Sequence, residues 1–216
     1  MIACDQICKR FGDRRVLEDV SFTIERGAFS ILLGPSGCGK TLLLSILAGL
    51  EAPSSGRVLI GGSDLTRVPP ERRPVTMVFQ RHALFPHLTV FENIAFSMRV
   101  RHLHQDAIRS RVEDLLGLID LESYRHAKPD VLSGGQCQRV AFARALASDA
   151  EVVLFDEPLN SLDKGMKSSL VAELKKWHKY KRFTALYVTH DLEEAFALGD
   201  RVLGMKKGKV AQTAFE

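Results

Sequence analysis

Residues 34–41 read Gly-Pro-Ser-Gly-Cys-Gly-Lys-Thr, which is the composition and spacing of a phosphate-binding loop. A short apolar run precedes the loop and an unbroken apolar run follows it, so the loop joins a predicted buried strand to a predicted buried helix. Glycines let successive backbone N–H groups point at phosphate oxygens, and the helix N-terminus adds its dipole. Lys40 is expected to reach the β- and γ-phosphates of a nucleotide, and the Thr41 hydroxyl to bind Mg²⁺. The alternative, a glycine turn without a ligand, fits this context less well.

One position departs from the usual form of such a loop. Leu42 stands where many phosphate-binding loops carry a second hydroxyl residue, used on the α-phosphate. A backbone N–H can serve there instead, so nucleotide binding is expected to survive with a lower affinity. The loop residues expected to contact the nucleotide are Gly34, Pro35, Ser36, Gly37, Cys38, Gly39, Lys40, Thr41 and Leu42.

Two further apolar runs end in polar residues that can act on a nucleotide. Residues 152–155 are followed by Asp156, at a place where an aspartate holds Mg²⁺, usually through water, and then by Glu157. Glu157 is placed to orient or deprotonate the attacking water. Residues 185–189 are followed by His190, which is expected to point into the same crevice because ligands lie at the carboxyl ends of parallel strands. Each group alone also has a plain structural interpretation, which the upstream loop disfavours.

A glutamine follows another apolar strand, predicted over residues 75–79. The amide oxygen of Gln80 can coordinate Mg²⁺ or the attacking water, and it can move away when its loop flexes. In isolation, Gln80 would be interpreted as an ordinary loop residue.

Residues 132–136 read Leu-Ser-Gly-Gly-Gln and lead into a predicted helix. A serine hydroxyl, glycine N–H groups and a helix N-terminus together form a second anion site. One nucleotide does not need two such sites in one subunit. A given five-residue string arises by chance in fewer than about one in a thousand chains of this length. The residues expected to contact nucleotide here are Ser133, Gly134, Gly135 and Gln136.

With these segments in this order, the chain resembles the nucleotide-binding domains of ABC transporters over nearly its whole length. The matching parts are the Walker A loop at 34–41, the Q-loop at Gln80, the signature at 132–136, Walker B at 152–156 with Glu157 beside it, the D-loop at 161–163 and the switch His190. The resemblance implies ATP and Mg²⁺ as ligands, with Thr41, Gln80 and Asp156 at the metal.

The same resemblance implies two subunits packed head to tail, with each ATP between the Walker A loop of one and the signature of the other. Glu157, His190 and Gln80 would then be catalytic, and Asp163 would contact the nucleotide. The aromatic residue that stacks on adenine in this family maps to Phe11. The alternative for Phe11 is a place in the hydrophobic core.

Strands alternating with helices imply an α/β fold with a parallel sheet covered on both faces. Val20, Phe22 and Ile24 alternate with polar residues as in a strand, whereas residues 87–150 look mostly helical. The predicted fold is a P-loop NTPase with a RecA-like parallel core, an N-terminal antiparallel β subdomain and an inserted helical subdomain. The chain is predicted to be a single domain over residues 1–216, with 1–86 and 151–216 forming the β subdomain and core, and 87–150 the helical subdomain.

Composition indicates a globular protein that does not cross a membrane by itself. Hydrophobic residues make up 45% of the chain and charged residues 26%, and the formal net charge of +4 does not argue for nucleic acid. The longest apolar stretch, residues 41–50, is far shorter than the ~20 residues that span a bilayer. The four cysteines form no C-x-x-C pair and no signal peptide is recognisable, which favours the cytoplasm.

Three segments, at residues 69–73, 77–80 and 83–90, resemble the importer ATPases for sugars, ferric iron, polyamines and sulfate. This resemblance implies that residues 81–87 receive the coupling helix of a membrane partner, with Leu84 and Phe85 as exposed apolar contacts. Alternatively, these two side chains pack inside the helical part. Many members of the group carry a further C-terminal regulatory domain, which a chain ending at Glu216 does not include.

The predicted function is therefore ATP hydrolysis that energises solute import. The expected partners are a second copy of the chain, membrane permease subunits and a solute-binding protein, with the chain peripheral at the cytoplasmic face of the inner membrane. Two rivals remain. One is an ABC-type ATPase of DNA repair, which would usually carry heptads or zinc-binding insertions that this chain lacks. The other is an ABC-type scaffold in cofactor assembly or cell division. The solute is not encoded in this chain.

Overall fold

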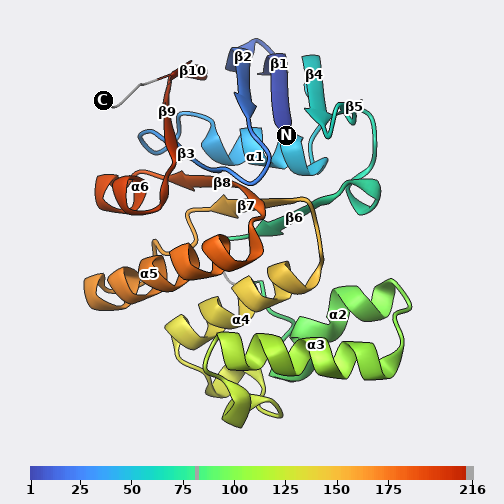
Figure 1. Ribbon diagram of the computed structural model, residues 1–216. Helices are drawn as coiled ribbons and strands as arrows, with labels where there is room; N and C mark the ends of the chain where they lie inside the picture. Colours follow the sequence, from blue (N-terminus) through green and yellow to red (C-terminus); the bar gives the residue numbers. More distant parts are fainter. Residues whose placement is uncertain (81–82, 213–216) are drawn as a thin grey trace. The chain divides into compact units, whose positions relative to one another are not determined.

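The computed structural model describes residues 1–80 and 83–212 (Figure 1). These residues form two compact units. The first unit comprises residues 1–77, 151–157 and 171–216, and the second comprises residues 78–150 and 158–170. The predicted division at residues 86/87 and 150/151 stays a prediction.

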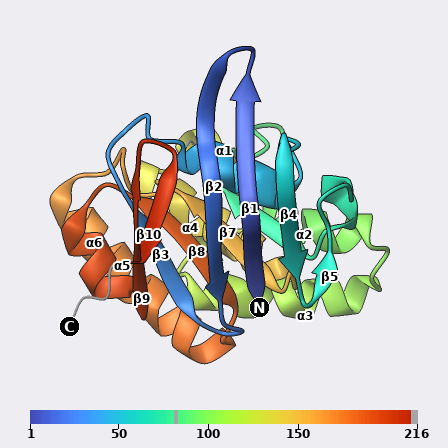
Figure 2. The same ribbon diagram turned by 90° about the horizontal axis from the view of Figure 1, so that it is seen from above.

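A four-stranded antiparallel sheet forms one layer of the first unit (Figure 2). Its order is β2-β1-β4-β5, from β1 (Ile2–Phe11), β2 (Arg14–Ile24), β4 (Ser55–Ile60) and β5 (Ser63–Asp64). The alternation predicted for β2 is confirmed, because Val20, Phe22 and Ile24 are all buried. Because these side chains lie on one face of the sheet, that face packs against the hydrophobic core.

A six-stranded sheet forms the other layer, in the order β10-β9-β3-β8-β7-β6. Its strands are β3 (Phe29–Leu33), β6 (Val75–Val78), β7 (Val152–Asp156), β8 (Thr184–Thr189), β9 (Arg201–Lys206) and β10 (Lys209–Gln212). The pairs β3–β8, β7–β8 and β3–β9 are parallel, and β10 returns antiparallel to β9. The buried strands predicted from apolar runs are confirmed, whereas β9 and β10 are additions that the sequence did not reveal.

Helix α1 (Lys40–Ala48) lies between the two sheets of the first unit (Figure 1). Leu43, Leu44 and Leu47 of this helix are fully buried in the core that both sheets share. The helix ends at Gly49, which has the left-handed φ of 83°. Arg73 closes this end, because one guanidinium nitrogen donates to the carbonyls of Ile46 and Leu47 at 2.8 and 2.9 Å. Burial lowers the pKa of Arg73.

Two more helices belong wholly or partly to the first unit. They are α6 (Leu192–Leu198) and the part of α5 (Lys164–Lys181) from residue 171 onward. Figure 1 shows α6 on the face of the six-stranded sheet opposite α1. A short 3₁₀ turn, η1 (Pro70–Arg72), precedes β6.

The second unit is helical, with α2 (Val90–Val100), α3 (Gln105–Leu118), α4 (Gly134–Ala147) and the 3₁₀ turns η2 (Glu122–Tyr124) and η3 (Pro129–Val131). Thr89 caps α2 in a reciprocal capping box with Glu92. The buried Asn93 amide donates to the carbonyls of Phe85, Leu88 and Thr89. These bonds anchor the loop before α2. Within the described part of the chain, no helix is long and apolar enough to cross a membrane.

Candidate functional site

The loop at residues 34–39 connects β3 to α1, as the sequence predicted. Gly37 and Gly39 have φ angles of 77° and 111°, in the region that side chains other than glycine rarely adopt. A Cβ on Gly34 would lie 2.3 Å from the Met205 carbonyl oxygen, so only glycine fits there. The first turn of α1 holds no acidic residue, and no side chain caps the helix. Its N-terminal amides are therefore available to an anion.

Lys40 lies along this loop, with its side chain only 4% exposed. Its Nζ donates to the carbonyl oxygens of Gly34 at 2.7 Å and Pro35 at 3.1 Å, and it lies 3.3 Å from Glu157 Oε1. A buried ammonium needs such partners because it has left water. These bonds hold the Lys40 charge against the loop, and its contact with phosphate stays a prediction.

Thr41 and Asp156 provide two oxygens that fit a magnesium ion. The Thr41 hydroxyl donates to Asp156 Oδ1 at 2.9 Å. Mg²⁺ prefers oxygen ligands such as a hydroxyl and a carboxylate, so this pair could hold the ion directly or through a bound water. Burial raises the pKa of Asp156, and the adjacent Glu157 charge adds to that rise, while Thr41 and Lys40 act against it. A bound cation would stabilise the carboxylate that burial disfavours.

Glu157 lies between a cation and an imidazole. One carboxylate oxygen faces Lys40, and the other lies 3.2 Å from His190 Nδ1. The Glu157 backbone has a φ of 42°, and its N–H donates to the Val188 carbonyl at 3.1 Å. A left-handed backbone in a residue other than glycine is strained and typical of functional sites. The side chain is 15% exposed, which leaves it within reach of water.

The order of the strands explains why these groups meet. Strands β3, β8 and β7 are neighbours and parallel, so their carboxyl ends lie at one edge of the sheet. The structure brings together the residues that the sequence placed after those three strands, namely Lys40, Thr41, Asp156, Glu157 and His190.

Phe11 ends β1 with 52% of its surface exposed, so the alternative of a core position is wrong. The Lys9 ammonium lies 5.0 Å from the centre of the Phe11 ring, and it also bonds Glu51 and the Ala52 carbonyl. An exposed ring is available for stacking. Its contact with adenine stays a prediction.

The residues of the predicted second anion site lie in the second unit, at the start of α4. Ser133 is the N-cap: its hydroxyl accepts from the Gln136 N–H at 3.3 Å, and its own N–H donates to Gln136 Oε1 at 2.9 Å. A Cβ on Gly135 would lie 2.3 Å from Met166 Sδ, so that glycine permits close packing within this unit. Asp163 accepts from the Met166 N–H at 3.0 Å, at the start of α5.

Gln80 is exposed and also belongs to the second unit. The roles of Gln80, of the 133–136 segment and of Asp163 at a nucleotide stay predictions.

The segment predicted to receive a membrane partner spans residues 81–87, of which 81 and 82 lie outside the described residues. Leu84 and Phe85 are half-buried rather than exposed. The Phe85 ring lies 4.5 Å from the Phe96 ring, and Arg144 lies over it at 5.4 Å. Burial lowers the pKa of Arg144. The alternative interpretation of Phe85, packing inside the helical part, agrees with these contacts.

One element that supports the phosphate loop was not predicted from the sequence. The turn between β9 and β10 contains Gly208, whose N–H donates to the Cys38 carbonyl at 3.1 Å. The Gly208 carbonyl accepts from the Glu18 N–H at 2.9 Å, which links the loop to β2. The Lys-Gly pair at residues 207–208 was a local signal for a turn, but its contact with the loop required the fold.

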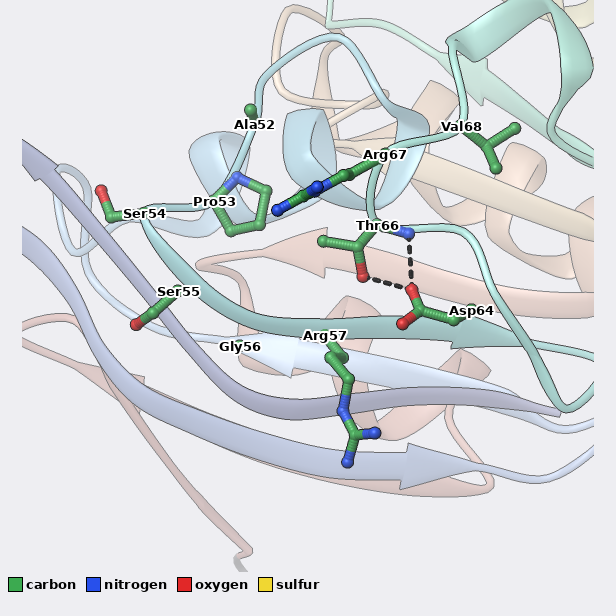
Figure 3. Close-up of a pocket in the computed structure, with 10 residues that line it drawn as sticks. All are labelled: Ala52, Pro53, Ser54, Ser55, Gly56, Arg57, Asp64, Thr66, Arg67 and Val68. Carbon is green, nitrogen blue, oxygen red and sulfur yellow. Dashed lines mark hydrogen bonds between the residues drawn. The ribbon is translucent and has the colours of Figure 1, made fainter.

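A pocket of about 570 Å³ lies beside β4, in the first unit (Figure 3). None of the residues predicted to contact nucleotide lines it. Figure 3 shows Asp64 accepting from the Thr66 N–H and hydroxyl, and Arg57 in the same view bonds Asp5. Arg57, Asp64 and Thr66 are thus engaged with the protein itself. Its lining residues are Ala52, Pro53, Ser54, Ser55, Gly56, Arg57, Asp64, Thr66, Arg67 and Val68.

A family model and individual protein sequences that match this chain all come from ABC transporters. The family model described as "ABC transporter" matches residues 17–160. The spermidine/putrescine import ATP-binding protein PotA of Thermotoga maritima is 47% identical over 211 residues, covering 98% of this chain and 57% of that protein. The Fe(3+) ions import ATP-binding protein FbpC 1 of Rhizobium meliloti is 48% identical, covering 95% of this chain and 58% of that protein. The chain thus spans just over half the length of these relatives.

Solved structures match over the whole chain. A dimeric ATP-binding cassette in a post-hydrolysis state, bound to ADP and Pi, superposes with a TM-score of 0.86 at 30% identity, covering 100% of both chains. A dimeric structure of a bacterial ABC transporter cassette gives the same TM-score at 32% identity, covering 98% of this chain and 97% of the other.

Proposed function

Because the chain belongs to the ABC transporter family, we propose that it binds and hydrolyses ATP and thereby energises solute import through a separate membrane permease. Its fold is that of the solved ABC cassettes, a P-loop NTPase with an added antiparallel sheet, as the sequence predicted. The observation that carries the proposal is the Glu157 carboxylate held between Lys40 and His190, beside the Thr41–Asp156 pair.

In the proposed reaction, each group of this cluster has a defined task. Lys40 leaves the Gly34 and Pro35 carbonyls and binds the β- and γ-phosphates. Glu157 accepts a proton from water as the water oxygen bonds to the γ-phosphorus and the bond to the β–γ bridging oxygen breaks, giving ADP and phosphate. His190 holds the γ-phosphate, and its contact with Glu157 at 3.2 Å keeps the base oriented beforehand.

Thr41 and Asp156, with Gln80, are the proposed holders of Mg²⁺. The metal supplies charge neutralisation on the β- and γ-phosphate oxygens when it is bound. The remaining residues of the loop contribute backbone N–H groups, so Leu42 is compatible with this role. Phe11 is proposed to stack on adenine with its exposed ring.

Two copies of the chain are proposed to enclose two ATP molecules head to tail. The segment 133–136 of one copy, with Asp163, would contact the nucleotide held by the loop of the other. The solved neighbours are dimers, which supports this proposal. Only a triphosphate spans both half-sites, so ATP stabilises the closed dimer and hydrolysis reopens it.

The proposed membrane partner is a permease, served by a solute-binding protein, with this chain at the cytoplasmic face of the membrane. The names of the relatives, which are import ATP-binding proteins, support it. A polyamine importer at 47% identity and an iron importer at 48% are equally similar, so resemblance does not select the solute. The residues nearest the permease are proposed to be those of the segment 81–87, with the helical subdomain, 87–150.

The test uses Glu157→Gln, which keeps the shape of the side chain but removes the base. The wild type should hydrolyse ATP, whereas the variant should bind ATP, lose turnover by at least about 100-fold and accumulate as a dimer with ATP. Tagged variant, retrieved natively with ATP, should bring a multi-spanning permease identified by mass spectrometry. Turnover at the wild-type rate would overturn the role of Glu157. Recovery of only soluble or nucleic-acid-linked partners would overturn transport.

A further inference from the structure

A buried carboxylate lies behind the catalytic cluster, and the proposed reaction does not use it. Glu194, in α6, is 5% exposed. Its Oε2 accepts one hydrogen bond from the Tyr187 hydroxyl at 2.8 Å and one from the Thr189 hydroxyl at 2.9 Å. Burial raises the pKa of Tyr187 well above its ordinary value, and the Glu194 charge adds to that rise. Tyr187 therefore stays protonated and keeps donating.

The start of helix α6 does not depend on this carboxylate. Asp191 is the N-cap, and its side chain accepts from the N–H groups of Glu193 at 2.8 Å and Glu194 at 3.4 Å. Taking a carboxylate out of water costs several kcal/mol unless hydrogen bonds offset the loss. Glu194 bears the cost of burial although Asp191 already caps the helix. Its buried carboxylate therefore serves a purpose other than starting α6.

Thr189 connects Glu194 to the catalytic cluster. Its hydroxyl donates to Glu194 and accepts from the Asp191 N–H at 3.0 Å, so it holds the backbone on both sides of His190. The Thr189 carbonyl also accepts from the Gly34 N–H at 3.3 Å, at the first residue of the phosphate loop. The His190 side chain is 43% exposed, so packing holds its ring weakly and its backbone has to fix its position.

We propose that Glu194 is a positioning residue: through the Thr189 hydroxyl it holds His190 in register with Glu157. The inference rests on the proposed ATPase function and extends it to a residue that touches neither nucleotide nor metal. A displacement of about 1 Å in such a group can cost on the order of 100-fold in rate. Removal of the network therefore lowers kcat and leaves the affinity for ATP nearly unchanged.

Thr189→Val tests the proposal, because valine has the same shape and lacks the hydroxyl. Its kcat should fall on the order of 10- to 100-fold, with a change in KM below about threefold. Thr189→Ser restores the hydroxyl and should recover most of kcat. Glu194→Gln keeps an oxygen that accepts both bonds and should stay within about threefold of wild type, whereas Glu194→Ala should resemble Thr189→Val.

Tyr187→Phe is the matched control for stability. It removes one hydrogen bond from the same carboxylate, at a cost of stability similar to Thr189→Val, without touching the backbone around His190. Measured well below Tm, its kcat should stay within about threefold of wild type. If Thr189→Val and Tyr187→Phe lower Tm alike and both keep the wild-type kcat, the network is structural and the inference is wrong.

The ATPase rate of the wild type distinguishes a failure of the positioning role from a failure of the proposed function. A wild-type chain that hydrolyses ATP, beside a Thr189→Val variant that does so equally well, overturns the positioning role alone. A wild-type chain that binds ATP without hydrolysing it overturns the proposed function, and the positioning role with it.

Discussion

The helices α1 and α4 both begin at glycine-rich segments suited to anions, but their N-termini are built in opposite ways. Helix α1 starts after Gly39 without any side-chain cap. Helix α4 starts at Ser133 with a reciprocal capping box to Gln136. The first end leaves its amides open to a ligand, whereas the second satisfies one of its amides from within the chain.

The difference extends to charge. Helix α1 begins with Lys40, and the buried Asp156 and half-buried Glu157 carboxylates lie beside it, so this end bears left-handed glycines and desolvated charges. Residues 133–136 carry no charged side chain. The N-terminus of α1 is therefore a binding site that lowers the stability of the protein. The N-terminus of α4 is a stable half-site, proposed to add amides and a hydroxyl to a phosphate that the loop of the other copy binds.

The largest expected change in Tm follows from disrupting the turn between β9 and β10, which supports the loop before α1. Gly208 has a φ of 77°, and a Cβ there would lie 2.2 Å from the Val16 carbonyl oxygen. Gly208→Ala should therefore break the bonds to Cys38 and Glu18, lower Tm by about 6–9 °C and raise the Kd for ATP about tenfold. Calorimetry and a nucleotide-binding titration measure the two effects.

Gly62→Ala is the control, because Gly62 has a similar φ of 86° but open space around it. It should cost only the left-handed backbone, about 1 kcal/mol or about 2–4 °C in Tm, with no change in the Kd for ATP. Equal effects of the two substitutions on nucleotide binding would refute the view that the α1 loop depends on this turn.

A smaller change in Tm, of opposite sign, is expected for a substitution at Asp156. Because burial and the Glu157 charge raise the pKa of Asp156, the ionised carboxylate destabilises the protein without metal or nucleotide. Asp156→Asn should keep the hydrogen bond from Thr41, raise Tm by about 3 °C at neutral pH and abolish Mg²⁺-dependent hydrolysis. Thermal unfolding in a metal chelator, without nucleotide, measures the stability.

The pH dependence of this effect has a defined direction. The raised pKa means that the folded wild type binds the proton more tightly than the unfolded chain, so its stability falls as pH rises from about 4 through the folded-state pKa. The advantage of Asp156→Asn should grow over that window and then level off. It should reverse with Mg²⁺ and ATP, which bind the wild type. A variant less stable than wild type in chelator at neutral pH would contradict this account.

The catalytic cluster was predictable because each member follows a recognisable local pattern. Asp156, Glu157 and His190 come directly after apolar runs, and parallel strands bring their ends to one edge whatever the rest of the fold does. Strands β9 and β10 were missed, although their turn supports the loop, because residues 201–212 have no chemistry-bearing motif and alternate weakly.

Burial was the property that the sequence predicted least well. Phe11 could be placed in the core or at the surface. Phe85 was expected either exposed or packed inside the helical part, and the structure half-buries it. Glu193 and Glu194 are neighbours of the same type in the sequence, yet Glu194 is buried and Glu193 is exposed. A carboxylate reveals its role only when the hydroxyls facing it are known, and Thr189 and Tyr187 come from another element.

The smallest expected effect separates the two tasks of Ser133. Two helices of the second unit start with the same reciprocal capping box: Thr89 with Glu92 in α2, and Ser133 with Gln136 in α4. Ser133→Ala and Thr89→Ala should each cost about 1 kcal/mol, seen as a fall in Tm of about 2 °C, since each removes one cap. As caps alone, the two residues are equivalent.

Of these two caps, only Ser133 is proposed to contact ATP. The two alanine variants should therefore differ in ATPase rate although they lose the same stability. Ser133→Ala should lower kcat about threefold to tenfold, and Thr89→Ala should leave it unchanged when both are assayed well below Tm. Ser133→Thr restores the hydroxyl that caps the helix and should recover the stability. If the two alanine variants lose the same stability and the same activity, the α4 end acts as a capped helix and no longer as half of a nucleotide site.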